Sequence, residues 1–168
     1  MQQALSEKFS KIYKQAEPVC RKYRTMFRPS IYDTKMNRYR FECKEKLFKY
    51  LCFGLGQMKE MPPKELSEAE KSVTEQDPYF LVKRIATTID AALVRTLNRG
   101  DRMDVSREYK NQWETLLTNI KDEQNLELKR KILSGQFEAG KIALANEIDF
   151  FTSIKRERII EKQKQYVA

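Results

Sequence analysis

The residue types that most often carry out acid–base or metal chemistry are scarce in this sequence. It contains no histidine, the side chain that titrates near neutral pH and commonly binds metals. Carboxylate pairs such as Glu68 and Glu70, or Glu123 and Glu127, lie in polar patterns typical of a solvated surface. Such a surface does not raise a carboxylate pKa as a catalytic pocket does. We therefore expect no catalytic residues, no cofactor and no enzymatic activity.

Thiol chemistry and metal binding are the next possibilities. The three cysteines, Cys20, Cys43 and Cys52, lie within helical patterns. A structural zinc site usually needs closely spaced cysteines, often with histidine, and neither is present. We therefore predict no metal site. We interpret the cysteines as buried free thiols of a protein from a reducing compartment.

Positive charge is the strongest chemical signal. The chain has 33 Lys and Arg residues against 24 Asp and Glu residues, and residues 1–60 hold 14 of the former and six of the latter. Such an excess favours an anionic partner, which can be phospholipid, nucleic acid or an acidic protein. The candidate contact residues are Arg21, Lys22, Arg24, Arg28, Lys35, Arg38, Arg40, Lys44, Lys129, Arg130 and Lys131.

Other interpretations of this basic region remain open. The basic residues can simply form a solvated helix face. Aromatic residues such as Tyr32 and Tyr39 lie among them, which suits stacking on RNA bases but also ordinary core packing. If Arg38 and Arg40 contact the partner, reversing their charges should weaken association more than folding.

The elements that position these residues are predicted to be long helices. Apolar residues recur at steps of three and four along most of the chain, as they do in amphipathic helices. Within one domain we predict basic helices over 1–60, an acidic connection over 61–77, a long middle helix over 78–124 and a last helix over 128–168. Asp77 and Pro78 form a helix start signal, and Gly100 is a possible bend.

The apolar seams of these helices are thin and need a packing partner. The predicted packing or dimer seam comprises Leu81, Ile85, Ile89, Leu93, Trp113, Leu116, Leu117, Ile120, Ile148 and Phe151. Antiparallel packing within the chain, together with dimerisation, would bury them. The expected fold is therefore all-α, an elongated three-helix coiled-coil bundle. No apolar run approaches the roughly 18 residues that span a bilayer, and the polar N-terminus is unlike a secretory signal.

Two parts of the chain resemble the BAR domain of sorting nexins. Residues 128–137, 145–151 and 162–167 are similar to its last helix, and residues 91–103 with Glu108 and Tyr109 to its middle helix. The resemblance covers roughly residues 80–168. It implies a curved dimer that senses membrane curvature in endosomal protein sorting. The implied partners are acidic phospholipid and a second copy or a related helical protein, and the implied location is cytoplasmic, peripheral on endosomal membranes.

A second hypothesis assigns the basic surface to a large complex. A basic, histidine-free helical chain with interleaved aromatic residues also suits an RNA-binding or structural subunit of a ribonucleoprotein or another protein assembly. The partner would then be nucleic acid or protein, and the location mitochondrial or ribonucleoprotein-associated.

Overall fold

The computed structural model describes residues 2–27, 34–98 and 104–167, apart from the side chains of residues 2–6, 8, 9 and 25–27. These residues form helices and loops and contain no strand, which confirms the predicted all-α class. The elements are α1 (Gln2–Phe27), α2 (Lys35–Lys59), η1 (Pro63–Glu65), α3 (Glu68–Thr74), α4 (Pro78–Leu97), α5 (Arg107–Lys121), α6 (Leu126–Leu133), α7 (Ala139–Leu144), η2 (Glu147–Phe150) and α8 (Ser153–Val167).

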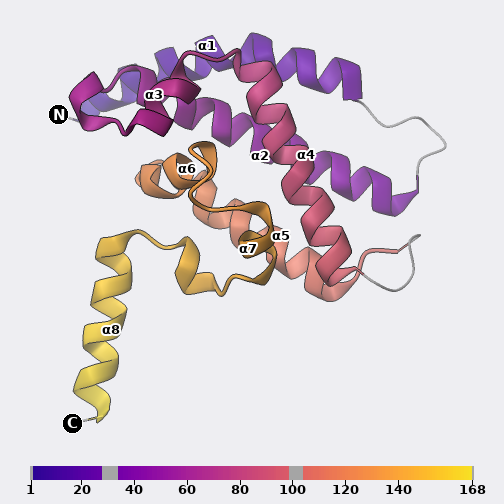
Figure 1. Cartoon of the computed structure of the whole chain (residues 1–168), viewed down its shortest axis with the longest axis vertical. Helices are drawn as coiled ribbons and strands as arrows, with labels where there is room; N and C mark the ends of the chain where they lie inside the picture. Colours follow the sequence, from indigo (N-terminus) through magenta and orange to yellow (C-terminus); the bar gives the residue numbers. More distant parts are fainter. Residues whose placement is uncertain (1, 28–33, 99–103, 168) are drawn as a thin grey trace.

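Helices α1 and α2 lie side by side and run in opposite directions (Figure 1). Tyr13 stacks on Phe53 with ring centroids 4.3 Å apart, and Tyr23 stacks on Phe48 at 4.4 Å. Pro18 lies inside α1, which continues through it as one helix. The aromatic pairs bury much apolar surface and hold α1 along its neighbour.

Helix α2 is the centre of the core. It contacts α1, α3, α4, α5 and α6, and Figure 1 shows α4 crossing it. Its inward face is almost continuously apolar after Phe41, so that packing partners can cover it from several sides. The fully or nearly buried residues of this face are Leu47, Phe48, Leu51, Phe53, Leu55 and Met58.

Helix starts follow local capping rules. The Asp77 side chain accepts a hydrogen bond from the backbone N–H of Tyr79 at 2.8 Å, and Pro78 occupies the first turn of α4. This confirms the start signal that the sequence predicts. Ser67 and Glu70 form a capping box at α3, so the predicted connection over 61–77 includes η1 and α3.

The predicted continuous helix over 78–124 is wrong, because α4 and α5 are separate. Asn98 ends α4 with φ −120° and ψ 55°, and its side-chain oxygen accepts from the N–H of Ser106 at 2.7 Å. The Ser106 hydroxyl donates to the Leu97 carbonyl at 2.7 Å and also caps α5. These polar groups satisfy the backbone at both helix ends. The predicted bend at Gly100 lies outside the described residues.

The predicted continuous last helix over 128–168 is also wrong. That range contains most of α6 and all of α7, η2 and α8. Gly135 follows α6 with φ +83°, a left-handed conformation that glycine adopts without steric cost. The molecule therefore has several short helices around α2 instead of an elongated three-helix bundle. The structure describes one chain and does not show the predicted dimer.

Candidate functional site

The predicted basic residues of α1 have individual partners. Arg21 pairs with Glu17 at 2.8 Å, and Arg24 lies 3.5 Å from Glu45. The Lys22 ammonium lies 4.5 Å from the centroid of the Tyr79 ring, a cation–π distance. All three side chains are exposed, so they can still contact a ligand from solvent. Arg28 lies outside the described residues.

Helix α2 carries an exposed basic stripe, which we define as Lys35, Arg38, Lys46 and Lys49. Their spacing by three, eight and three residues keeps them on one face of a helix. The exposed Glu42 also lies on that face, as does the half-buried Glu45, which pairs with Arg24. Lys35 and Arg38 were predicted contact residues. Lys46 and Lys49 complete the stripe, and helical spacing was the signal that could have added them.

Arg40 and Lys44 face inward from α2. The Arg40 guanidinium donates to the Asp90 carboxylate at 2.7 Å, and the Tyr109 hydroxyl donates to the same carboxylate at 2.5 Å. The Asp90 side chain is 1% exposed. The two hydrogen bonds that it accepts, from Arg40 and Tyr109, therefore join α2, α4 and α5 within the core. Lys44 is half-buried, and burial lowers its pKa. Arg40 is therefore a structural residue and not the predicted surface contact.

The second predicted basic patch, at α6, is not a free cationic surface. Lys129 is fully buried, and its ammonium donates to the Asp122 carbonyl at 2.9 Å. Its ammonium also lies 5.7 Å from the centroid of the Phe53 ring. Burial lowers the pKa of Lys129 to about 8 because a low-dielectric environment disfavours the charged form. Lys129 thus cannot contact the surface of an anionic partner.

Arg130 and Lys131 are engaged in ion pairs. Arg130 makes a two-pronged hydrogen bond to Glu70 at 2.5 and 2.9 Å and also donates to the Glu65 carbonyl at 3.1 Å. The hydrogen bonds from Arg130 hold the pKa of Glu70 down at about 2. Lys131 lies 3.2 Å from Glu127. The prediction missed the partner of Arg130, because sixty positions separate the two residues along the chain.

Eight of the ten predicted seam residues lie in or against the core of a single chain, and Ile148 and Phe151 do not belong to it. Trp113, Leu116, Ile120 and the α4 residues face one shared apolar cluster, and Leu117 packs against it. The buried seam residues are Leu81, Ile89, Leu93, Trp113, Leu116 and Ile120, whereas Ile85, Leu117, Ile148 and Phe151 are half-buried. Packing inside the chain therefore accounts for the burial of this set.

Polar side chains at the turn after α5 fix the start of α8. Asn125 caps α6 and donates to the Phe150 carbonyl at 2.9 Å. Glu127 accepts hydrogen bonds from the backbone N–H and the hydroxyl of Ser153 at 2.9 and 2.5 Å. Burial raises the pKa of Glu127, but the Ser153 and Lys131 hydrogen bonds outweigh it and lower that pKa to about 2. The sequence analysis placed Glu127 on a solvated surface and predicted no role for Asn125 or Ser153, whereas Glu127 is half-buried.

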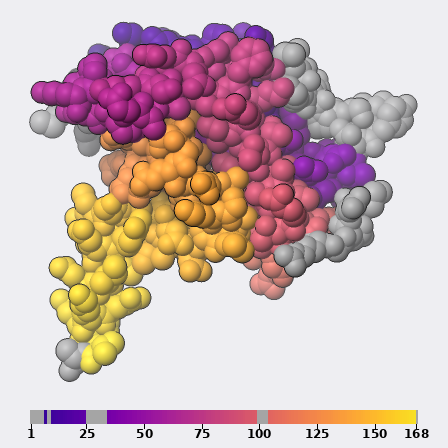
Figure 2. Space-filling view, viewed as in Figure 1, coloured from indigo at the N-terminus to yellow at the C-terminus, as the bar shows by residue number. Residues whose placement is uncertain are grey.

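Helix α8 stands away from the rest of the molecule, as the yellow segment of Figure 2 shows. None of its residues is buried. It carries five basic and two acidic side chains. Ile154 is 64% exposed and Tyr166 is 91% exposed. A helix of this kind gains little from packing on its own chain, and it presents a mixed basic and apolar surface to a partner.

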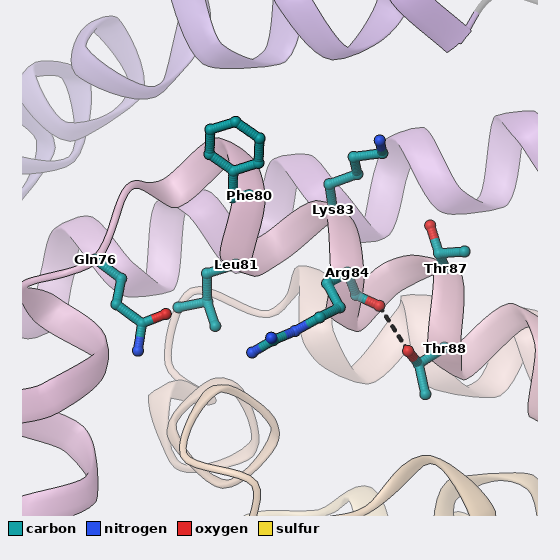
Figure 3. A pocket seen from close by; sticks show the side chains of 7 residues that line it. All are labelled: Gln76, Phe80, Leu81, Lys83, Arg84, Thr87 and Thr88. Atoms are coloured by element: carbon teal, nitrogen blue, oxygen red, sulfur yellow. Dashed lines mark hydrogen bonds between the residues drawn. The ribbon is translucent and has the colours of Figure 1, made fainter.

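A surface hollow of about 440 Å³ runs along α4. Figure 3 shows its lining, where the Thr88 hydroxyl donates to the Arg84 carbonyl at 2.8 Å. The lining side chains are Gln76, Phe80, Leu81, Lys83, Arg84, Thr87 and Thr88. They include no carboxylate or thiol, so no carboxylate in the lining can serve the threonine hydroxyls as a general base.

Two classes of site have no counterpart among the described residues. In residues 2–27, 34–98 and 104–167, no group of three Cys, Asp or Glu side chains is arranged to hold a metal ion. Within the same ranges, every helix is too short or too polar to cross a lipid bilayer. The exposed basic side chains of α2 and α8 offer charge-based binding.

Comparison with known proteins gives a family. The model of the central domain of transcription factor S-II (TFIIS) matches residues 35–167. This segment begins at the first residue of α2 and ends at the last residue of α8, so α1 lies before it. A search of curated proteins gave no match.

This match corrects the resemblance to sorting nexins. Nearly all of the residues 80–168 that carried the resemblance lie inside the matched segment, and their helical patterns are common to many α-helical folds. The predicted curvature-sensing function, protein transport role, endosomal location, acidic phospholipid partner and related dimer partner are therefore wrong. The second hypothesis, a subunit acting with a large nucleic-acid-related complex, fits better. The chain belongs to the family of the TFIIS central domain.

Proposed function

We propose that this chain is a transcription-elongation module that docks on RNA polymerase. The match of residues 35–167 to the TFIIS central domain carries the proposal. The module would act by binding, in the nucleus, together with the transcription machinery. Two predictions from the sequence become part of the proposal: the chain is a single domain, and it has no enzymatic activity of its own.

Helix α8 supports a docking role. It lies inside the matched segment yet has no buried residue. Its basic side chains include Arg158, Lys162 and Lys164, next to the exposed Tyr166. A basic helix with exposed apolar residues complements an acidic protein surface that has apolar gaps. We assign α8 to the contact with an acidic face of the polymerase.

The basic stripe of α2 supplies a second contact in this proposal. Its four side chains are exposed along residues 35–49 of one helix face, a span of about 20 Å at 1.5 Å per residue. Long-range attraction between such a stripe and an acidic partner increases the association rate and is screened by salt. We therefore expect polymerase binding to weaken as ionic strength rises.

The test is direct binding of the full chain to purified RNA polymerase, measured by biolayer interferometry at low and high salt. Arg158→Glu with Lys162→Glu changes α8, and Lys35→Glu with Arg38→Glu changes the α2 stripe. Each pair should weaken binding by about ten-fold or more, because rim charges control steering and attraction.

A matched control separates these sites from net charge. Lys64→Glu with Lys121→Glu makes the same change in charge at exposed positions outside α2 and α8. This variant should bind within about two-fold of the unaltered chain. Equal losses in all three variants would reject the assigned surfaces, and absence of binding by the unaltered chain would reject the function.

A further inference from the structure

Helices α1 and α2 bring two cysteines together. Tyr23 of α1 stacks on Phe48 of α2 at 4.4 Å. Cys20 lies one helical turn before Tyr23, and Cys52 lies one turn after Phe48. Because the helices are antiparallel, one turn back along α1 from Tyr23 and one turn forward along α2 from Phe48 run in the same direction in space. The two thiols therefore face each other across the helix pair.

The thiol groups of Cys20 and Cys52 interact and are not equivalent. The Cys52 thiol donates a hydrogen bond to the Cys20 sulfur, and this hydrogen bond, helped by the Lys49 ammonium, lowers the pKa of Cys20 against the effect of burial. The same hydrogen bond and burial raise the pKa of Cys52. Cys20 is half-buried, whereas Cys52 is only 5% exposed. Cys20 is thus the more reactive and more accessible sulfur.

Cys43 provides an internal comparison. It is 5% exposed, and burial raises its pKa to about 12 despite a hydrogen bond with Tyr39. Besides burial, the groups that shift the pKa of Cys43 are Tyr39, Lys46, Asp90 and Glu42, and Cys43 lies about two and a half turns of α2 before Cys52. Cys43 therefore has the properties of an inert core thiol, and the reactive chemistry belongs to the other two.

We propose that Cys20 and Cys52 form a redox modification site, at which a peroxide converts the two thiols into a disulfide that joins α1 to α2. The Cys20 thiolate attacks one oxygen of hydrogen peroxide, the O–O bond breaks, and hydroxide leaves and takes up a proton. The resulting sulfenic acid is then attacked by the Cys52 sulfur. The S–S bond forms as the S–O bond breaks, and the Cys52 proton leaves with the hydroxyl as water. Two thiols and one peroxide thus give one disulfide and two waters.

The disulfide would attach α1, which lies before the segment that matches the TFIIS central domain, to a helix inside that segment. Cys52 lies within residues 35–167, whereas Cys20 lies before them. The disulfide would convert the packing of α1 on α2 into a covalent link between Cys20 and Cys52, which restricts the unfolded chain and stabilises the fold. In a reducing compartment such a bond forms transiently and acts as a sensor of oxidation. This site stands independently of polymerase docking.

The test uses the full chain, reduced and then freed of reductant, with hydrogen peroxide as the probe. Oxidised protein is alkylated under denaturing conditions and analysed by intact mass and peptide mapping. We expect a mass loss of two hydrogens, a Cys20–Cys52 linked peptide, one remaining alkylated thiol and full reversal by dithiothreitol. The Cys43→Ala variant should behave in the same way.

Two variants and a second measurement keep the proposal open to refutation. Cys20→Ser changes the half-buried position and should abolish the disulfide while circular dichroism shows an unchanged helix content. Cys52→Ala should do the same, and oxidation should raise the melting temperature of the unaltered chain and of Cys43→Ala but not of Cys20→Ser or Cys52→Ala. A linkage that includes Cys43, a linkage between two chains, or oxidation to sulfinic acid without any disulfide would overturn the proposal.

Discussion

Arg38 and Arg40 are two positions apart in α2, and the fold treats them in opposite ways. Arg38 is exposed, whereas the Arg40 guanidinium donates to Asp90, a carboxylate that is 1% exposed. A buried charge without a partner is costly because it loses the solvation of water. The predicted effect of charge reversal on association therefore applies to Arg38, and the effect at Arg40 is on folding.

Replacing Arg40 with methionine tests this difference. Arg40→Met leaves the buried Asp90 carboxylate without its cation, and we expect a loss of about 3 kcal/mol or more in the free energy of unfolding. Arg38→Met should change it by less than about 0.5 kcal/mol. Urea denaturation followed by circular dichroism measures both. Similar losses in the two variants would contradict the structural role of Arg40.

The Glu70–Arg130 pair makes stability depend on pH. The hydrogen bonds from Arg130 lower the pKa of Glu70 from 4.5 to about 2. Between these values the unfolded chain binds a proton that the folded chain does not, so the free energy of unfolding falls as the pH falls through this window. The contribution is complete above 4.5.

The variant Glu70→Gln isolates this contribution, because Glu127 titrates in both proteins. The difference in free energy of unfolding between the unaltered chain and Glu70→Gln should shrink from about pH 5 to about pH 2. Urea denaturation across that range measures it. A difference that stays constant with pH would show that Arg130 does not stabilise the ionised carboxylate.

At the scale of elements, a glycine sets how closely α2 and α6 approach. A Cβ atom added to Gly54 would lie 2.8 Å from both Cβ and Cδ of Lys129. Real Cβ atoms essentially never come so close to another atom, and the Lys129 backbone end cannot swing away. The close approach places the buried Lys129 stem against α2 beside Gly54, and its ammonium donates to the Asp122 carbonyl.

Two alanine substitutions compare this contact with an open position. Gly54→Ala should lower the free energy of unfolding by about 1–3 kcal/mol, since overpacking exceeds the gain in helix propensity. Gly140→Ala, in α7, meets no atom within 4 Å and should raise it by about 0.5–1 kcal/mol. Thermal and urea unfolding show whether each substitution raises or lowers the free energy of unfolding. Stabilisation by Gly54→Ala would contradict the close approach.

At the scale of the whole molecule, the chain consists of a packed body and a projecting helix. The body around α2 buries the apolar core, whereas α8 has no buried residue and leaves the body in Figure 1. Its start is fixed by Glu127 and Ser153, so it is positioned at one end only. Stability therefore resides in the body, and α8 is available for binding.

Truncation after Arg156 separates these two roles. The shortened chain keeps Ser153 and the hydrogen bond from Arg156 to the Phe151 carbonyl, so its free energy of unfolding should change by less than about 1 kcal/mol. Its affinity for RNA polymerase should fall by about ten-fold or more under the docking proposal. A large loss of stability would instead assign α8 to the fold.

Local patterns in the sequence were sufficient for some features. The all-α class followed from apolar spacing, and the start of α4 followed from Asp77 and Pro78, because both signals act within one or two helical turns. The break between α4 and α5 was missed because its stabilising groups, Asn98 and Ser106, act through hydrogen bonds that exist only after the turn has formed.

By itself, the sequence determined that the chain is all-helical and that it carries excess positive charge, since both depend on residue type and near neighbours. Only the tertiary structure decided which charges remain at the surface. Lys129 and Arg40 are buried or paired through residues on other helices, whereas Lys35 and α8 face solvent. Apolar periodicity shows which residues share a face of a helix, but it does not show which other helices pack against that face. That packing decides whether a charged side chain is buried and stabilises the fold or stays exposed to a partner.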